Sequence, residues 1–182
     1  MESIDTFTTA RLAATRRSAH DYDDLRRLHQ DPLVMATLSA DGQPLAAEQT
    51  RASLNSSLEH WERYGFGVWT FRDLADGEFV GYCGLRREIF QGREEVELLY
   101  ALLPAYWGRG LAGEMAAAVL AIGFERLGLV DVIAYTLTTN RASRRVIERA
   151  GFSYERDIVH VGLPHVLYRL NPGRQESGVR SQ

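Results

Sequence analysis

A strand, a proline and a glycine-rich turn stand directly before the clearest helical pattern of this chain. Residues 98–103 form an apolar run of strand length, Pro104 ends it, and glycines follow at positions 108, 110 and 113. An alanine-rich helical pattern begins at Leu111. Proteins build anion sites in this way, because free N–H groups at a helix start point toward the anion and the helix dipole assists. The sequence therefore predicts an anion site at this turn, where glycines let the backbone approach closely.

Length and composition restrict the chain to an ordinary globular class. It has 182 residues, of which 45% are hydrophobic and 25% charged, and this is enough for one domain with a proper core. A formal net charge of −3 gives no reason to expect a nucleic-acid partner. Cys83 is the only cysteine, which excludes an intramolecular disulfide and favours a cytoplasmic setting. No apolar run approaches the ~18 residues of a membrane span, and the first residues lack a signal-peptide pattern, so we expect no membrane partner.

Hydrophobic periodicity predicts helices first, then an antiparallel meander, and then alternating strands and helices. The predicted helices are residues 22–30, 45–63, 111–127 and 140–150, with a short turn at 33–38. The predicted strands are residues 9–15, 66–71, 78–87, 95–103, 129–136, 152–156 and 158–170. This order indicates an α+β fold, with a mixed central sheet of about six or seven strands, about four helices and one parallel crossover. We expect residues 1–7 to be a flexible N-terminus, 8–170 a single domain, and 171–182 a flexible C-terminal tail.

Two other interpretations of the glycine-rich turn need to be weighed. Residues 108–113 match the G-x-G-x-x-G dinucleotide fingerprint by letter. The strand before them belongs to an antiparallel meander, however, and no acidic residue follows at the end of a second strand about 20 residues on. A P-loop would need Gly-Lys-Ser/Thr, which the turn lacks. A Rossmann-like nucleotide enzyme is therefore the weaker rival, beside a glycine-rich connection without a ligand.

The turn resembles the acyl-CoA pyrophosphate loop of the GNAT superfamily of N-acetyltransferases, whose motif is Q/R-x-x-G-x-G/A. The motif falls on residues 107–112, with Trp107 in place of Gln or Arg. Residues 104–110 are similar to the Pro-x-Tyr-Trp-Gly-x-Gly loop of the ribosomal-protein N-terminal (alanine/serine) acetyltransferase-like subgroup. Residues 140–152 resemble the N-x-x-S…G-F segment of the same family. Shorter similarities to the subgroup's first three strands extend the resemblance over about residues 8–170.

The resemblance implies a GNAT acyl-CoA N-acyltransferase fold, with acetyl-CoA as cosubstrate and no metal. It implies transfer of the acetyl group to a primary amine, by direct attack of the amine on the thioester. The implied acyl-CoA contacts are Leu102 and Leu103 for the pantetheine arm, Trp107, Gly108, Arg109, Gly110, Leu111, Ala112 and Gly113 for the pyrophosphate, and Asn140. Arg141, Arg144 and Arg145 follow Asn140 in a helix start, where cations oppose the dipole. A CoA phosphate would relieve that conflict at one of the three, and we name Arg144.

Two residues are candidates for the chemistry. An amine with a pKa near ~10 must lose its proton before it attacks a thioester. Glu97 lies inside an apolar strand, where a buried carboxylate is costly unless it is paired or useful. It would take the proton directly or through water; the alternative is a structural glutamate bonded across the sheet. The resemblance places Ser143 near the thioester sulfur as a donor to the leaving thiolate, whereas by position it could equally cap its helix.

The acceptor stays open at this point. A small-molecule amine and a protein N-terminus both fit, and a homodimer is a further candidate partner. Tyr82, Tyr100, Trp69 and His165 line the acceptor pocket or belong to the core. The five histidines have no metal-ligand spacing. A non-catalytic acyl-CoA-binding module on the same fold is the alternative function.

Overall fold

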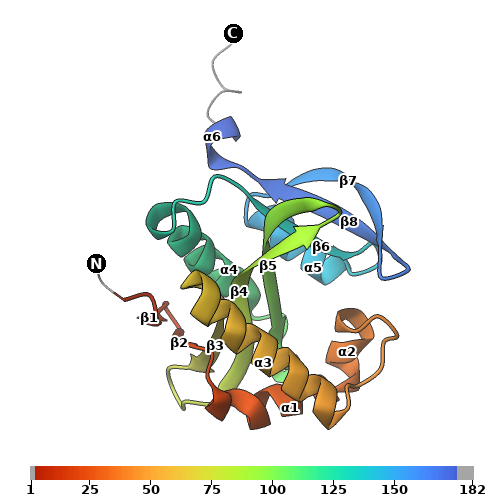
Figure 1. Ribbon diagram of the computed structural model, residues 1–182. Coiled ribbons are helices and arrows are strands. Elements are labelled where there is room, and N and C mark those ends of the chain that lie inside the picture. Colours follow the sequence, from red (N-terminus) through yellow and green to blue (C-terminus); the bar gives the residue numbers. More distant parts are fainter. Residues whose placement is uncertain (1–2, 176–182) are drawn as a thin grey trace.

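Eight strands join in one mixed sheet, in the order β1-β2-β3-β4-β5-β6-β8-β7 (Figure 1). The computed structural model describes residues 3–175, and their strands are β1 (Thr6–Thr8), β2 (Leu12–Arg16), β3 (Val68–Asp73), β4 (Phe79–Phe90), β5 (Arg93–Leu102), β6 (Val132–Leu137), β7 (Ser153–His160) and β8 (Leu163–Leu170). The α-helices are α1 (Tyr22–Gln30), α2 (Pro32–Leu38), α3 (Ala47–Tyr64), α4 (Leu111–Ala121), α5 (Arg141–Arg149) and α6 (Pro172–Gln175). The expected α+β class with one parallel crossover is confirmed, because β5 and β6 are the parallel pair.

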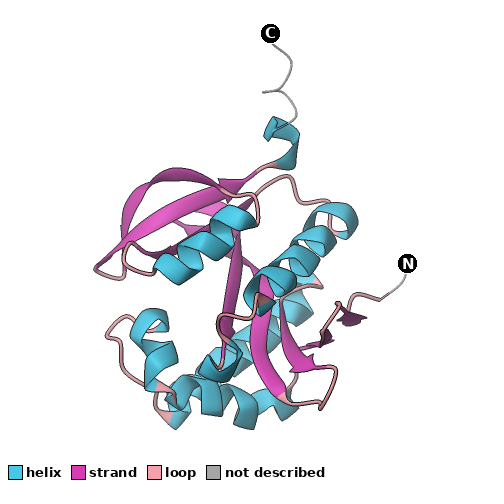
Figure 2. Ribbon diagram, turned by 180° about the vertical axis from the view of Figure 1, so that it is seen from behind, coloured by secondary structure: helices cyan, strands magenta, loops and turns pink. Residues whose placement is uncertain are grey.

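Helices cover both faces of the sheet, as Figures 1 and 2 show from opposite sides. Alternation along β5 decides which side chains meet which layer. Leu98 and Leu102 belong to one hydrophobic cluster with Met115 of α4. Leu99 and Ala101 point the other way, into a second cluster with residues of α1, α2 and α3. Both faces of β5 are therefore buried, which explains its nearly continuous apolar sequence.

The N-terminal expectation is wrong for Thr6 and Phe7. We expected residues 1–7 to be flexible, yet β1 pairs in antiparallel register with β2. The Phe7 ring packs edge-on against Trp69 and Phe71, with centroids 5.7 and 5.8 Å away. This aromatic contact holds the extra strand, which brings the sheet to eight where six or seven were expected.

The other boundaries shift less. The predicted helix 111–127 stays helical to Arg126, but its last part, Ile122–Arg126, winds as a π-helix. Within the predicted tail, Pro172–Gln175 form the short helix α6, and the rest of the tail lies outside the described residues. No helix within residues 3–175 is long and apolar enough to cross a membrane.

β5 pairs with β4 along its whole length but with β6 at one position. Among the described residues, that single parallel pair is Glu97 with Ile133. The Leu103 N–H donates to the Val80 carbonyl oxygen of β4 at 2.9 Å. Since backbone groups alternate in direction along a strand, those of Leu102 and of alternate residues before it point away from β4. Residues 98–102, which we call the open edge of β5, therefore offer backbone polar groups on the side where β6 turns away.

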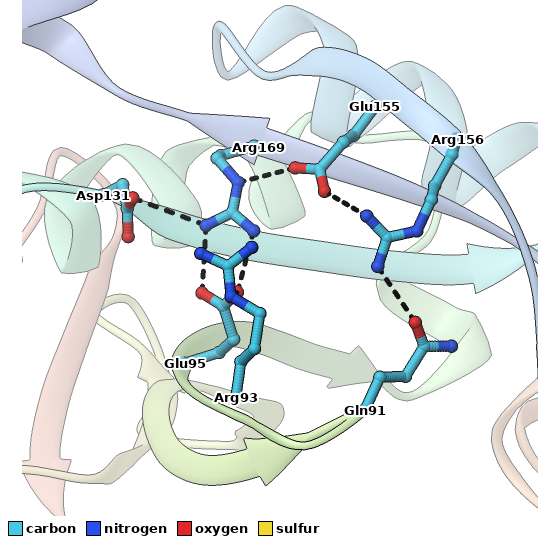
Figure 3. A network of polar contacts seen from close by, with 7 residues as sticks. All are labelled: Gln91, Arg93, Glu95, Asp131, Glu155, Arg156 and Arg169. Carbon is cyan, nitrogen blue, oxygen red and sulfur yellow. Dashed lines mark hydrogen bonds and ion pairs between the residues drawn. The ribbon is translucent and has the colours of Figure 1, made fainter.

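A network of ion pairs is built around Glu95, two residues before Glu97 on β5 (Figure 3). Both Nη atoms of Arg169 on β8 donate to the carboxylate of Glu95 on β5, at 2.9 and 2.8 Å. Arg169 also contacts Asp131 before β6 and Glu155 on β7, at 3.4 and 2.5 Å. The network uses arginine because the 182 residues contain 21 arginines and no lysine. Its planar fork binds several carboxylates at once, and here it connects β5, β7, β8 and the residue before β6.

Candidate active site

Glu97 lies at the point where β5 and β6 part. Its side chain is on the β5 face of Leu99 and Ala101 and is only 5% exposed. Arg86, its cross-strand partner on β4, places Nη2 2.6 Å from the Glu97 carboxylate. The carboxyl is thus both paired across the sheet and located beside the open edge of β5, so the two interpretations of Glu97 are not exclusive.

Burial dominates the protonation equilibrium of this carboxyl. It raises the pKa of Glu97 to about 7, although Arg86 opposes the rise, and Glu88 adds to it. Close to neutral pH a substantial fraction is then ionised and able to accept a proton. A carboxyl with this pKa is better matched to an amine than an ordinary, exposed glutamate is.

A cluster of ring side chains contacts the Glu97–Arg86 pair through Tyr135 of β6. The Tyr135 hydroxyl lies 3.4 Å from Arg86 Nη2, and the Tyr135 ring stacks on Phe90 at 4.7 Å. His160 lies 4.8 Å and His165 6.0 Å from the same tyrosine, measured between ring centroids. His165 therefore lies near Tyr135, the tyrosine that contacts Arg86. Trp69 does not, because it is fully buried with its indole N–H on the carbonyl oxygen of Ile4.

Ser143 is held at the start of α5. Its N–H donates to Asn140 Oδ1 at 3.1 Å, so Asn140 is the N-cap of the helix. The Ser143 hydroxyl lies 2.9 Å from the hydroxyl of Tyr100 on β5. Tyr100 was assigned by sequence only to a pocket or core role, because nothing in the spacing of residues 43 apart predicts this contact.

The glycine-rich turn has the geometry of an anion cradle. Gly108 and Gly110 both adopt left-handed backbone conformations, with φ of 71° and 75°. A Cβ built on Gly108 would meet no atom within 4 Å, so the space beside the turn is open. Trp107 Nε1 donates to the Leu102 carbonyl oxygen at 2.8 Å. An open, left-handed turn directly before a helix start is a geometry that can accept an anionic group.

Other predicted contacts are engaged elsewhere or are part of the core. Leu103 N–H is used by β4, and the Leu111 side chain is buried against the sheet. Arg144 donates through Nε to the Tyr168 hydroxyl at 3.0 Å and through Nη1 to the Thr138 carbonyl at 3.3 Å. Two protein contacts therefore hold Arg144, while its neighbours Arg141 and Arg145 are exposed.

Arg11, which was not identified from the sequence, binds the backbone of the glycine-rich turn. Arg11 Nη1 donates to the carbonyl oxygen of Arg109 at 2.8 Å, and Arg11 Nε donates to Glu114 of α4 at 2.7 Å. The contact joins residues about one hundred positions apart, so no local pattern signals it. The Arg109 guanidinium lies 5.4 Å from the Tyr106 ring centroid, within the turn.

A sheet that opens beside a buried carboxyl and leads into a glycine-rich helix start defines an acyl-CoA transferase architecture. The sequence profile of the acetyltransferase (GNAT) domain matches residues 11–153, and the chain belongs to this family. It is an acetyl-CoA-dependent N-acetyltransferase. The resemblance stated from the sequence is thereby confirmed.

Curated relatives match most of the chain. The uncharacterized protein YkkB of Bacillus subtilis (strain 168) is 31% identical over 141 residues, covering 78% of this chain and 80% of that one. The FsC-acetyl coenzyme A-N(2)-transacetylase of Aspergillus fumigatus is 31% identical over 158 residues, covering 82% of this chain and 65% of that one.

Solved structures share the fold over nearly the whole chain. The acetyltransferase from Agrobacterium tumefaciens str. C58 has a TM-score of 0.79 and 26% identity, covering 94% of this chain and 96% of that one. RimL, a ribosomal L7/L12 alpha-N-protein acetyltransferase in complex with coenzyme A, has a TM-score of 0.74 at 18% identity, covering 93% and 98%. The second likeness concerns the fold alone.

Proposed function

We propose that this protein acetylates a primary amine, by direct attack of the amine on the thioester of acetyl-CoA, with Glu97 as the general base. The observation that carries the proposal is the buried Glu97 carboxyl, whose pKa is raised to about 7 beside the open edge of β5. The amine nitrogen bonds to the carbonyl carbon, its proton passes to Glu97, and the electron pair of the C–S bond leaves on sulfur. Placing both reactants in one site supplies much of the rate.

The acyl-CoA side of the proposal uses backbone more than side chains. The open edge of β5, ending at Leu102, pairs with the pantetheine arm and polarises the thioester carbonyl. Because the Leu103 N–H is already bonded to β4, Leu103 contributes by position only. The turn from Trp107 to Gly113 binds the pyrophosphate, and Asn140 presents α5 to the CoA arm. One of the exposed arginines beside Arg144 is better placed than Arg144 itself to reach a phosphate.

The acceptor is proposed to be a small-molecule amine. The Glu97–Arg86 pair lies beside Tyr135, whose ring contacts the rings of Phe90 and His160, and these rings suit an amine carried on an apolar or planar group. The name of the Aspergillus relative, an N(2)-transacetylase, supports transfer to a nitrogen acceptor. A protein N-terminus is the other candidate, and the two classes are separated by assay.

The test measures CoA release from acetyl-CoA with a panel of small amines and N-terminal peptides, read by a thiol reagent. Cys83 does not disturb the readout, because burial raises the pKa of this thiol and hides it. Glu97→Gln should abolish most of the release, and Glu95→Gln on the same strand face should not. If the protein binds CoA but releases no thiol with any acceptor, the non-catalytic binding module replaces the enzyme.

A further inference from the structure

Tyr100 links β5 to α5 across the open edge. It lies on the face of β5 opposite Glu97, and its hydroxyl is 2.9 Å from Ser143 Oγ and 3.2 Å from the Ser143 carbonyl oxygen. The bond to Asn140 fixes the backbone of Ser143. Because α5 follows β6 in the chain, this contact joins the two parts of the molecule that separate beyond the Glu97–Ile133 pair.

The number of hydroxyl protons limits which hydrogen bonds Tyr100 and Ser143 can donate. A tyrosine hydroxyl has one proton to donate, a carbonyl oxygen only accepts, and a serine hydroxyl does either. If Tyr100 donates to Ser143 Oγ, at the shorter of the two distances, the serine proton is left to point at a third group. If Tyr100 donates to the carbonyl oxygen instead, the Ser143 hydroxyl can donate a hydrogen bond to the Tyr100 oxygen. Both arrangements fit the two distances. Only the first leaves the serine a proton to donate to a third group, and the thiol titration described below distinguishes the two.

A leaving thiolate is the third group that the proposed reaction puts at this place. The pantetheine arm is proposed to run along the open edge, where the backbone groups of residues 100 and 102 face away from β4. Its sulfur then lies between β5 and the first turn of α5. A thiol with a pKa near ~8.5 leaves as a thiolate, and a hydrogen bond to the anion is stronger than one to a neutral group.

We propose that Tyr100 is a positioning residue for thioester cleavage, whose hydroxyl donates to Ser143 Oγ and so directs the serine proton at the sulfur of acetyl-CoA. This inference rests on the proposed function. The thiolate receives the electron pair of the C–S bond, is held by the Ser143 hydroxyl, and takes a proton from water after release. Tyr100 keeps its proton throughout, since burial raises its pKa well above the ordinary value for tyrosine.

The test uses product CoA, so that it does not depend on knowing the acceptor. The thiol pKa of bound CoA is titrated by the ultraviolet absorbance of the thiolate, in the wild type, Tyr100→Phe, Ser143→Ala and the double variant. We expect the wild type to lower this pKa below that of free CoA, and Tyr100→Phe to raise it again by about one unit. The double variant should match Ser143→Ala, because Tyr100 acts through the serine.

Turnover with an active acceptor is the second readout. Tyr100→Phe should lower kcat about tenfold while the KM for acetyl-CoA stays within about twofold. Tyr154→Phe, which removes an exposed tyrosine hydroxyl on β7, is the matched control and should behave as the wild type. If Tyr100→Phe changes only the thermal stability or the KM, its role is structural and the inference is overturned.

The proposed acetyl transfer and the proposed role of Tyr100 would be overturned by different results. If the wild type acetylates amines but the bound thiol pKa ignores both Tyr100→Phe and Ser143→Ala, the positioning role is wrong and the enzyme remains. If no amine is acetylated while the bound thiol pKa still depends on Tyr100, the positioning of Ser143 stands and the proposed transfer is wrong.

Discussion

Trp107 reaches back from the glycine-rich turn and donates its indole N–H to the carbonyl oxygen of Leu102, 2.8 Å away. The contact fixes the distance between the end of β5 and the turn, which are the proposed sites for the pantetheine arm and the pyrophosphate. It also consumes the Leu102 carbonyl, leaving the Leu102 N–H for a ligand. Trp107, which stands where the motif has Gln or Arg, thus connects the glycine-rich turn to β5, although the residue is 48% exposed.

Trp107→Phe should therefore weaken substrate binding more than catalysis. The phenylalanine keeps an aromatic ring but loses the donor, so the turn is no longer tied to β5. We expect the KM for acetyl-CoA to rise several-fold with kcat nearly unchanged, and the free energy of unfolding to fall by about 1 kcal/mol. Steady-state kinetics and urea unfolding measure both. An unchanged KM would show that the indole bond does not position the turn.

Glu97→Gln should remove a limb of the pH–rate profile. A general base works only in its ionised form, so with Glu97 in the proposed role we expect activity to rise with pH through about 7, the raised pKa of this carboxyl. The glutamine variant should lose about 100-fold in kcat/KM and should no longer show that limb. Profiles are measured from mildly acidic to mildly alkaline pH with an acceptor that does not titrate there.

Glu95→Gln is the comparison for that variant. Glu95 is buried on the same face of β5 but is bound to Arg169 in the ion-pair network. Breaking this pair should lower the free energy of unfolding by about 3 kcal/mol and leave the pH limb in place. A limb that disappears in both variants would assign the titration to the fold and not to Glu97.

His29 makes the fold sensitive to acid. It is 3% exposed and contacts Thr50 Oγ1 at 3.1 Å. Burial lowers its pKa to about 4, with Arg17 and Arg26 adding to the lowering. Between about pH 6.5 and 4, His29 is protonated in the unfolded chain but neutral in the folded chain. The free energy of unfolding therefore falls as pH falls, by about 3 kcal/mol in total. Unfolding free energies across this range measure the slope.

His29→Gln should flatten that pH dependence, because glutamine keeps a hydrogen-bonding partner for Thr50 but does not titrate. His20→Gln is the control, since His20 is an exposed histidine one turn before the same helix. Equal slopes in all three proteins would mean that another group causes the acid sensitivity.

Two glycines of the turn should separate backbone strain from ligand contact. Gly110→Ala imposes a side chain on a left-handed conformation with φ of 75° and should cost about 1–2 kcal/mol of stability. Gly113 lies within α4 with open space around it, so Gly113→Ala should stabilise the helix by about 0.5–1 kcal/mol. Both changes should raise the KM for acetyl-CoA, because both add a methyl group beside the proposed pyrophosphate site. A KM that is unchanged in Gly113→Ala would remove Gly113 from that site.

The elements with strong periodicity were predictable from the sequence. The helix predicted over residues 22–30 is α1 with the same bounds, because its apolar spacing and the Pro32 that follows are local signals. β1 was not predictable, since its three residues are held by the distant rings of Trp69 and Phe71. Local patterns thus predict helices and strands with strong periodicity, whereas a strand that depends on distant packing cannot be recognised from its own residues.

The candidate site likewise contains residues that the sequence indicates and pairings between residues that it does not. The turn and Glu97 were found by motif and by the oddity of an acid inside an apolar strand. The partner of Glu97 is Arg86, which is set by the β4–β5 register, and the partner of Ser143 is Tyr100, which is set by the position of α5. Arg144 was placed by charge at a helix start, and the hydroxyl of Tyr168 on β8 turned out to bind it. Pairings between elements require coordinates.

The arginine-only set of basic residues has a chemical consequence. Acetylation removes the charge of a lysine ammonium and with it any ion pair that the lysine makes, whereas a guanidinium stays protonated and is a poor nucleophile. Arg86, Arg169 and Arg11, which pair with Glu97, Glu95 and Glu114, therefore cannot be neutralised by the acetyl donor that the enzyme handles. These ion pairs are therefore not removed by the acetyl donor, and acetyl groups found on lysine in an assay come from the acceptor.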